Sequence, residues 1–469
     1  MKAFQAIIKL TFQNAMRSHI FQLLLGLLGI CVIAIPFTAS GDGSAAGFIQ
    51  VSLLYSLAGV GVILALSSIW VSCYIMTQDI EGYQIHMVLS KPVSRVVIWL
   101  AKFSGVVLLH AILLFISAVV IYVIIIGQFA RNDFQKGDKE RVQNEVLVGR
   151  RVFKFTPPDL EQRSREMLAD RLQKVAITGE HISITQENEK SILQEMRKMA
   201  IAEDAKVGFE QVRQWKFDNL PTDNEQPLFL RYRTYVGKVS TKDQRMTAGQ
   251  WYIGVPIYER DADGKIVDSK RYQFQFYAYP AENIRSGEFY EKVIPTKDFK
   301  VVSSDGKVMI AYLNLDPEKQ TQYFQPSDGP QILMKVSGFF ENYLRAVAVI
   351  MLEIIILTAL GCAVAGCMSM PTAIFISIAY LFCGSFASYL AENALAGDGI
   401  VKVFSKILLV LIIPLQKFSV SEMVSKGELI EFSFMGELFL NYFVLKALPI
   451  MLIFMYFYKK REIGLVVRR

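Results

Sequence analysis

The length of its apolar runs is the feature that most constrains this chain. About 20 consecutive apolar residues are needed to cross the hydrocarbon core of a bilayer as a helix. Runs of that length occur towards both ends of the 469-residue chain, whereas its middle has the composition of an ordinary soluble protein. We therefore expect six membrane helices, near residues 20–38, 49–76, 103–127, 341–366, 371–391 and 438–458.

The first eighteen residues have a different pattern. Phe4, Ile7, Ile8, Phe12 and Ala15 recur at helical spacing, with basic and amide side chains on the opposite face. This pattern favours a helix over 1–18 that lies in the membrane interface, with a solvated helix as the alternative.

Basic residues beside the spans predict the orientation, because Lys and Arg are enriched in cytoplasmic loops. We expect both termini in the cytoplasm of a cell with an inner (plasma) membrane, spans one to three within 19–128, and spans four to six within 339–469. This topology places the following basic residues on the cytoplasmic side: Lys2, Lys9, Arg17, Lys91, Arg95, Lys102, Lys459, Lys460, Arg461, Arg468 and Arg469.

Between the fifth and sixth spans lies one further apolar run, Phe404–Pro414. It is too short to cross a bilayer, so the segment 400–416 is predicted to be re-entrant or to lie on the outer surface.

The segment 129–338 is predicted to form an extracytoplasmic α+β domain. The pattern over Phe129–Pro221 is mostly helical, with helical runs over Leu160–Val175 and Ile192–Ala200, and from Leu228 onward the apolar period changes to two. Asp263-Gly264 and Asp305-Gly306 are hairpin signals. The fold class is thus a polytopic α-helical membrane protein of six spans with an inserted domain, β-sandwich-like plus helices. The candidate strands are Phe229–Val236, Trp251–Glu259, Ile266–Tyr279, Phe299–Ser303 and Val308–Asn314.

Several tyrosines in these strands offer two interpretations. They either pack in the core, which we favour, or form an aromatic surface for sugar or lipid. Acidic and basic residues are nearly balanced in this domain, which argues against nucleic acid as a partner. The tyrosines are Tyr252, Tyr258, Tyr272, Tyr277 and Tyr279.

Motifs for chemistry are missing. The sequence contains no G-x-x-x-x-G-K-[ST], no H-E-x-x-H and no G-x-S-x-G. The four histidines are scattered, and all five cysteines lie within the apolar blocks, so neither a metal site nor a disulfide framework is expected. We predict a non-enzymatic chain that has no catalytic residues and holds no cofactor.

The loop Gln78–Lys102, predicted to be cytoplasmic, reads QDIEGYQIHMVLSKPVSRVVIWLAK. Ile80, Tyr83, Val88 and Leu89 give a short, partly amphipathic helix that ends before Pro92. The loop resembles that of permeases of the ABC-2 exporter family. The matching residues are Glu81, Gly82, Leu89, Ser90, Pro92, Val93, Arg95 and Lys102.

The charged finish Tyr458–Ile463, the six helices and the short segment before the sixth span are similar to that family too. The long insertion 129–338 departs from many of its members, which puts simple substrate analogy in doubt. The resemblance implies that the loop is a coupling helix docking in a groove of a separate ATPase subunit, which would carry ATP-Mg. The coupling residues it implies are Asp79, Glu81, Gly82, Tyr83, Leu89, Pro92, Arg95 and Lys102.

Two ionisable residues, Glu353 and Lys446, fall inside predicted spans at similar depth. Charged groups in hydrocarbon are costly and usually face the bundle interior or pair with one another. We predict either that Glu353 and Lys446 lie close together or that Lys446 extends outward beside Glu437.

These patterns favour a permease subunit of an ABC-2-like exporter, acting as a homodimer or with a second permease in a lipid membrane. A membrane-anchored receptor or scaffold whose outer domain binds an envelope component is the second hypothesis. An integral-membrane enzyme using Glu353 is the third, and no constellation of residues supports it. The substrate is not encoded in any motif.

Overall fold

The structure is a computed structural model that describes residues 2–38, 44–81, 93–131, 136–156, 160–178, 186–222, 226–237, 245–259, 271–296, 300–325, 328–387, 410 and 412–461. The chain divides into two compact units. The helical unit comprises Met1–Gly149 and Val336–Arg469, and the β unit comprises Arg150–Lys335. The β unit thus begins at Arg150 instead of the expected position 129.

The helical unit contains five helices that are long and apolar enough to cross a membrane. They confirm five of the six predicted helices. The remaining one, predicted over 371–391, is α10 (Met370–Ser385), which at 16 residues is shorter than the others. The five are α2 (His19–Thr38), α3 (Ala45–Glu81), α5 (Arg95–Arg131), α9 (Phe339–Cys367), and the continuous run of α14 (Phe432–Leu438), η3 (Phe439–Ala447) and α15 (Leu448–Lys460).

The amino-terminal helix α1 (Lys2–Arg17) is present, as its amphipathic pattern predicted. It packs against α5 at Gly105, where a Cβ atom would come within 2.9 Å of the Thr11 side chain. Ala15 is buried in a small cluster with Val71 of α3 and Val106 of α5. One face of α1 is therefore occupied by the helical unit itself.

Close helix approach depends on glycine at particular places. A Cβ atom at Gly361 of α9 would lie 2.0 Å from the Ser72 hydroxyl of α3, and one at Gly59 would lie 2.3 Å from the Cys31 sulfur of α2. Gly61, two residues after Gly59 on α3, differs because a Cβ atom there would meet nothing within 4 Å. Small residues thus let α3 pack closely on two neighbours and leave open space at one position.

The last long helix changes its hydrogen-bond register in the middle. Residues Phe439–Ala447 form a π-helix, η3, directly before Pro449 in α15. Proline has no backbone N–H to give the carbonyl four residues earlier, and a wider register accommodates that loss. Lys446 lies in this stretch.

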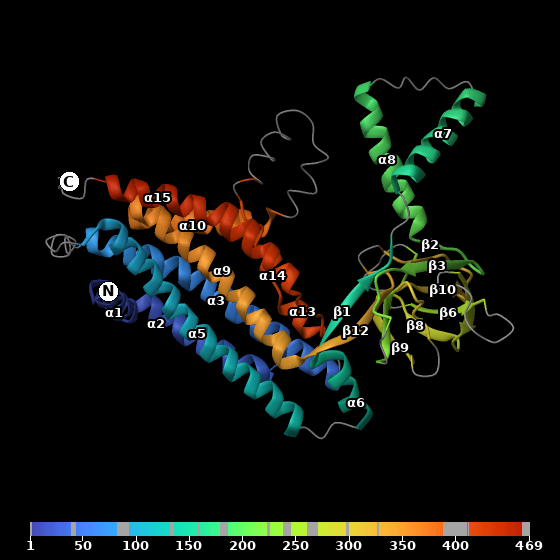
Figure 1. Ribbon diagram of the computed structural model, residues 1–469, viewed down its shortest axis with the longest axis horizontal. Helices are drawn as coiled ribbons and strands as arrows, with labels where there is room; N and C mark the ends of the chain where they lie inside the picture. Colours follow the sequence, from blue (N-terminus) through green and yellow to red (C-terminus); the bar gives the residue numbers. More distant parts are fainter. Residues whose placement is uncertain are drawn as a thin grey trace. The chain divides into compact units, whose positions relative to one another are not determined.

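Several helix ends meet at one end of the helical unit, which we call the loop end. There α3 finishes, α5 begins, α9 gives way to α10, and α15 finishes (Figure 1). A Cβ atom at Gly366 would lie 3.3 Å from Tyr458 and 3.5 Å from Trp99, so α9, α15 and α5 are in direct contact there.

At the other end, short elements join the helices. They are α6 (Lys136–Arg141), η1 (Val142–Val146), η2 (Leu415–Phe418) and α13 (Ser421–Ser425). Gly427 adopts a φ of +66° directly against the Glu145 carbonyl, where a side chain would clash. The segment 136–149 therefore packs within the helical unit, which explains the later start of the β unit.

Of the predicted re-entrant segment 400–416, residues 400–409 and 411 lie outside the described part.

In the β unit, two larger antiparallel sheets share one hydrophobic core. The first has the order β1-β12-β4-β9, and the second has the order β3-β10-β6-β7 with β8 also paired to β6. The strands of the first are β1 (Val148–Lys154), β12 (Gln331–Gly338), β4 (Leu228–Arg233) and β9 (Phe289–Ile294). Those of the second are β3 (Val212–Phe217), β10 (Val308–Asn314), β6 (Met246–Tyr258), β7 (Tyr272–Ala278) and β8 (Glu282–Arg285).

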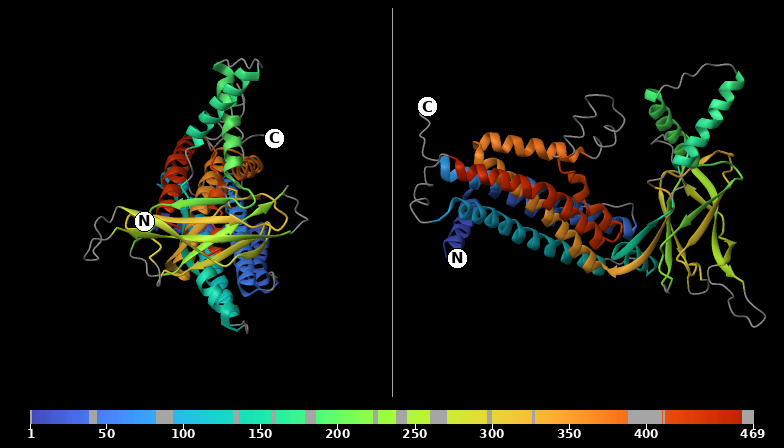
Figure 2. Two further views of the ribbon diagram at one scale, coloured as in Figure 1. Left: turned by 90° about the vertical axis from the view of Figure 1, so that its right-hand side faces the viewer. Right: turned by 45° about the horizontal axis from the view of Figure 1, so that its top comes forward.

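Aromatic side chains fill the space between these sheets. The Trp251 ring on β6 lies 4.7 Å from Tyr232 on β4, 4.7 Å from Tyr312 on β10 and 5.7 Å from Trp215 on β3, measured between centroids. Figure 2 shows the two layers of strands. The predicted sandwich-like arrangement is therefore present. A small third sheet joins β2 (Lys206–Val207), β11 (Gln322–Tyr323) and β5 (Tyr235–Val236).

The secondary structure predicted for this unit is right in part. Helices α7 (Leu160–Thr178) and α8 (Gln186–Asp204) are confirmed, and β10 has the predicted bounds. The strands β1, β2 and β3 lie in a region expected to be helical. Asp263-Gly264 and residues 266–270 of another strand lie outside the described part.

The strand predicted at Phe299–Ser303 is wrong for its described residues. Residues 300–303 are irregular, although the Val301 side chain is buried in the core. The chain turns at once, since the Ser303 N–H donates to the Lys307 carbonyl and Gly306 adopts a φ of +74°. An apolar side chain here fills the core without a neighbouring strand to pair with.

Candidate functional site

A buried ion pair joins the two helices that flank the loop. Lys102 of α5 lies 2.8 Å from the Asp79 carboxylate of α3, and their side chains are 5% and 7% exposed. The Lys102 ammonium also donates a hydrogen bond of 2.8 Å to the Ile75 carbonyl. Because both charges are withdrawn from water, separating them would leave an uncompensated buried charge. The end of α3 and the first turns of α5 are thus held together.

Arg95, at the start of α5, connects the loop to the end of the last helix. Its guanidinium donates to the carbonyl oxygens of Lys459 and Arg461, at 3.1 and 2.6 Å. Helix carboxyl termini leave carbonyl groups without partners inside the helix, and a cation near them is favourable. Arg461 in turn donates to the Gly366 carbonyl at the end of α9, at 2.9 Å.

Two large side chains pack under this polar layer. Trp99 of α5 and Tyr458 of α15 are 0% and 1% exposed. They meet at Gly366 of α9, where the missing side chain makes room for them. The loop end is consequently a packed junction of α3, α5, α9 and α15, tied together by Asp79, Lys102 and Arg95.

The predicted coupling residues fall into three groups. Asp79, Arg95 and Lys102 face the protein and join helices. Glu81 is the last residue of α3, and only its backbone is described. The remaining predicted residues, Gly82, Tyr83, Leu89 and Pro92, lie outside the described part of the chain.

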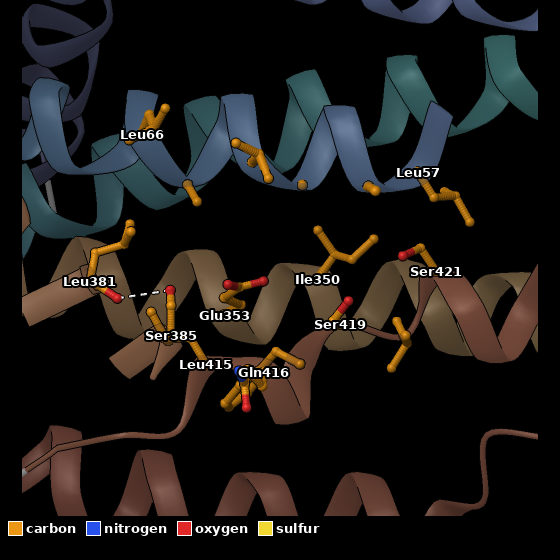
Figure 3. A pocket seen from close by; sticks show the side chains of 16 residues that line it. Leu57, Leu66, Ile350, Glu353, Leu381, Ser385, Leu415, Gln416, Ser419 and Ser421 are labelled. Atoms are coloured by element: carbon orange, nitrogen blue, oxygen red, sulfur yellow. Dashed lines mark hydrogen bonds between the residues drawn. The ribbon is translucent and has the colours of Figure 1, made fainter. Parts of the chain in front are cut away.

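The second feature is a pocket of about 280 Å³ within the helical unit. Its described walls come from α3, α9, α10 and the segment 415–421. Most of the lining is apolar, and α3 contributes the small residues Ala58, Gly61 and Ala65. Figure 3 shows Glu353 projecting from α9 into this space, between α3 and the segment that carries Gln416.

The Glu353 carboxylate has no hydrogen bond or ion pair with any other residue that the structure describes. Its side chain is partly exposed, and the space it faces is the pocket. The other polar groups in the lining are hydroxyl and amide groups, from Ser385, Gln416, Ser419 and Ser421. None of these carries a positive charge.

Lys446 and Glu353 form no ion pair in the described part of the molecule. The Lys446 ammonium donates to the Ile412 carbonyl at 2.7 Å and lies 5.6 Å from the Tyr442 ring centroid. Glu437, the alternative neighbour, lies 3.9 Å from Lys417. The two charges are separated because Glu353 faces the pocket, whereas Lys446 is held by the chain just before η2.

The β unit holds its own buried charge cluster, which sequence patterns did not reveal. Glu291 on β9 accepts hydrogen bonds from Arg150 on β1, at 2.7 and 3.1 Å, and from Arg231 on β4, at 2.6 Å. Burial alone would raise the pKa of Glu291. The charges of Arg231 and Arg150 lower it by more than burial raises it, so the pKa is below its ordinary value. The three strands bring these residues together, although they are far apart in the chain.

Of the five tyrosines predicted to pack in the core, four are half-buried and one is exposed. None is fully buried, and Tyr277 is 43% exposed. Of the five, Tyr279 packs against the core as predicted, whereas the fully buried aromatic residues of the core include Trp215, Tyr232, Trp251 and Tyr312. On the outer side, Tyr258 and Tyr272 lie as a cross-strand pair with ring centroids 5.5 Å apart.

In the described ranges, no group of three or more His, Cys, Asp or Glu side chains is placed to hold a metal ion. All five cysteines are described, and all are free thiols. In the helical unit, charged groups gather at the loop end, whereas the described lining of the pocket contains the single charged residue Glu353.

The comparisons with known proteins give no further guide to the chemistry of these sites. No protein-family model, no curated protein and no solved structure matches this chain.

Proposed function

We propose that this chain is the transmembrane permease subunit of an ABC-2-like exporter in the inner (plasma) membrane. In this proposal α10 is counted as a span, which makes six, and both termini lie in the cytoplasm. The β unit lies outside, where it receives substrate or docks an envelope partner. Two copies, or one copy with a second permease, form the pathway. ATP-Mg binds to a separate ATPase subunit.

The observation that carries this proposal is the anchoring of the loop. Residues 82–92 leave α3 and return to α5 between two fixed points, the Asp79–Lys102 ion pair and the Arg95 contacts to α15. A force applied to the loop by a partner would therefore act on α3, α5 and α15 together. A loop on unanchored ends would move by itself.

The energy enters as a difference in binding. An ATPase that binds two permease conformations with different affinities shifts the population between them when it binds or releases nucleotide. The packed junction around Trp99 and Tyr458 can move as a rigid body, because its members are joined by buried contacts. Helix motion at the loop end would then reach the pocket, which the same helices α3 and α9 line.

A membrane-anchored receptor or scaffold is the alternative. The observation that favours it is the separate β unit with its partly exposed tyrosine pair on the outer face of one sheet. A receptor of this kind would bind an envelope component without stimulating any ATPase.

The test is to purify the full chain from its host membrane with its associated proteins and to measure ATP hydrolysis. The permease proposal expects an ATPase subunit to co-purify. It also expects Glu81→Ala and Arg95→Ala each to reduce the stimulated rate at least about tenfold, which corresponds to about 1.4 kcal/mol in activation free energy. Arg131→Ala, at the exposed far end of α5, is the matched control. Wild-type coupling in both loop variants, or the absence of any ATPase, would contradict the permease proposal.

A further inference from the structure

The helical-unit pocket carries an inference about the chemistry of a ligand. A carboxylate withdrawn from water normally has a cation or several hydrogen-bond donors around it. Asp79, in the same unit, has Lys102 at 2.8 Å. Glu353 has neither an ion pair nor a hydrogen bond within the described residues, although the same helix bundle surrounds it.

The internal partner predicted from the sequence is engaged elsewhere. Lys446 donates to the Ile412 carbonyl and does not reach Glu353. No residue that the structure describes supplies a positive charge to Glu353, which leaves that role open to a ligand that enters the pocket.

The walls of the pocket indicate what else that ligand must have. Leu57, Val62, Leu66, Ile350 and Leu381 make most of the described lining apolar. Hard metal ions such as Mg²⁺ and Ca²⁺ are usually held by several carboxylate and carbonyl oxygens at short range, whereas the described lining offers a single carboxylate, with hydroxyl and amide groups from four other residues, among mostly apolar side chains. An apolar body beside the charge matches such walls.

The size of the space agrees with a small organic molecule. The pocket measures about 280 Å³, close to the lower limit of about 300 Å³ typical of small-molecule sites. Gly61 contributes to that space, since a Cβ atom there would meet nothing within 4 Å. The small side chains Ala58 and Ala65 lie on the same wall.

We propose that this pocket binds an organic cation with an apolar body, whose ammonium group lies against Glu353. Gln416 and Ser419 provide the side-chain amide and hydroxyl oxygens that can contact the cationic head group. That such a cation is the exported substrate rests on the proposed function, whereas its binding does not require an ATPase.

The binding test uses the full chain in lipid nanodiscs with no ATPase present. The probe is radiolabelled 3-phenylpropyl-trimethylammonium, and its uncharged carbon isostere is the competitor. We expect saturable binding of the cation and no competition by the isostere. Glu353→Gln should weaken binding at least about tenfold. Glu341→Gln, an exposed carboxylate at the start of the same helix, should leave it unchanged.

A steric variant tests the location independently. Gly61→Leu places a side chain in the open space and should abolish binding. Gly29→Leu makes the same change on α2, also with no atom within 4 Å, but outside the pocket lining, and should not affect binding. Equal binding of the isostere, or wild-type affinity in Glu353→Gln or Gly61→Leu, would overturn the proposal.

The two proposals fail separately. Binding of the cation by a chain that recruits no ATPase would refute the exporter and leave the pocket assignment standing. ATPase coupling in a chain that binds no cation would refute the pocket assignment alone.

Discussion

The two units differ in whether a carboxylate inside the fold has a charged partner. In the β unit, Glu291 on β9 is held by two arginines, Arg231 from the adjacent strand β4 and Arg150 from β1 at the other edge of the same sheet. In the helical unit, Glu353 lines a pocket and has no partner among the described residues. A paired buried charge stabilises the fold, because removing one partner would leave the other charge buried without a counter-ion. An unpaired one adds nothing to the fold and is better explained by binding.

The helical unit is not a place where charges go unpaired in general. Asp79 and Lys102 form a buried pair at its loop end, with side chains nearly as inaccessible as the Arg150–Glu291 pair of the β unit. The exception is therefore Glu353 itself. Four predictions test this contrast.

The largest effect is expected from Arg150→Met. This change leaves Glu291 buried with Arg231 alone, and breaking a buried pair of this kind costs about 3–5 kcal/mol. Hydrogen exchange in the full chain should show loss of protection in β1, β4 and β9. Lys154→Met, at the exposed end of β1, is the control. Unchanged protection would mean that the cluster does not stabilise the sheet.

The Asp79–Lys102 pair should behave in the same way inside the helical unit. Asp79→Leu and Lys102→Met should each lower the free energy of unfolding by about 3 kcal/mol, because each leaves the charge of the other residue buried without a partner. The double variant should lose less than either single one, since no charge is left alone. Unfolding in detergent measures all three. Additive losses would show that the two residues act independently.

Acid should weaken the β unit through Glu291. Its pKa is lower in the folded protein than its ordinary value, so the charged cluster stabilises the fold fully above the unfolded-state pKa. That contribution is lost as the pH falls through the folded-state value. Hydrogen exchange of β9 across this acidic range should therefore show a pH dependence that Glu291→Gln removes. Equal pH dependence in the variant would assign the acid sensitivity to other groups.

The smallest effect is expected for Glu353→Gln, and its sign is the opposite. No partner is lost, and a poorly solvated charge is removed, so the helical unit should be as stable as before or more stable by about 1 kcal/mol. Thermal unfolding without ligand measures this. A clear destabilisation would show that Glu353 supports the fold, and the contrast between the units would fail.

The two regions also differ in how well sequence patterns predicted them. Five long apolar helices were predicted because a membrane-spanning helix can be recognised from the composition and length of its own segment. The strands β1 and β3 were missed, since a short strand is decided by the neighbours it pairs with. The irregular chain at Val301 shows the converse, an apolar run without a pairing partner.

The candidate site was predicted unevenly for the same reason. Glu353 and Lys446 were singled out because charges within apolar runs are visible in the sequence. Their separation was not visible, because it depends on which way each helix faces. The pairing of Asp79 with Lys102 could not be predicted from the sequence, because it depends on the start of α5 lying beside the end of α3.

What the sequence by itself determined is the partition of the chain into long apolar helices and a β-rich unit, since hydrophobic length and period are local properties. Which charges meet and which remain alone was decided only by the tertiary structure. The energy of a buried charge depends on the groups within a few ångströms of it, and folding brings those groups from distant parts of the chain.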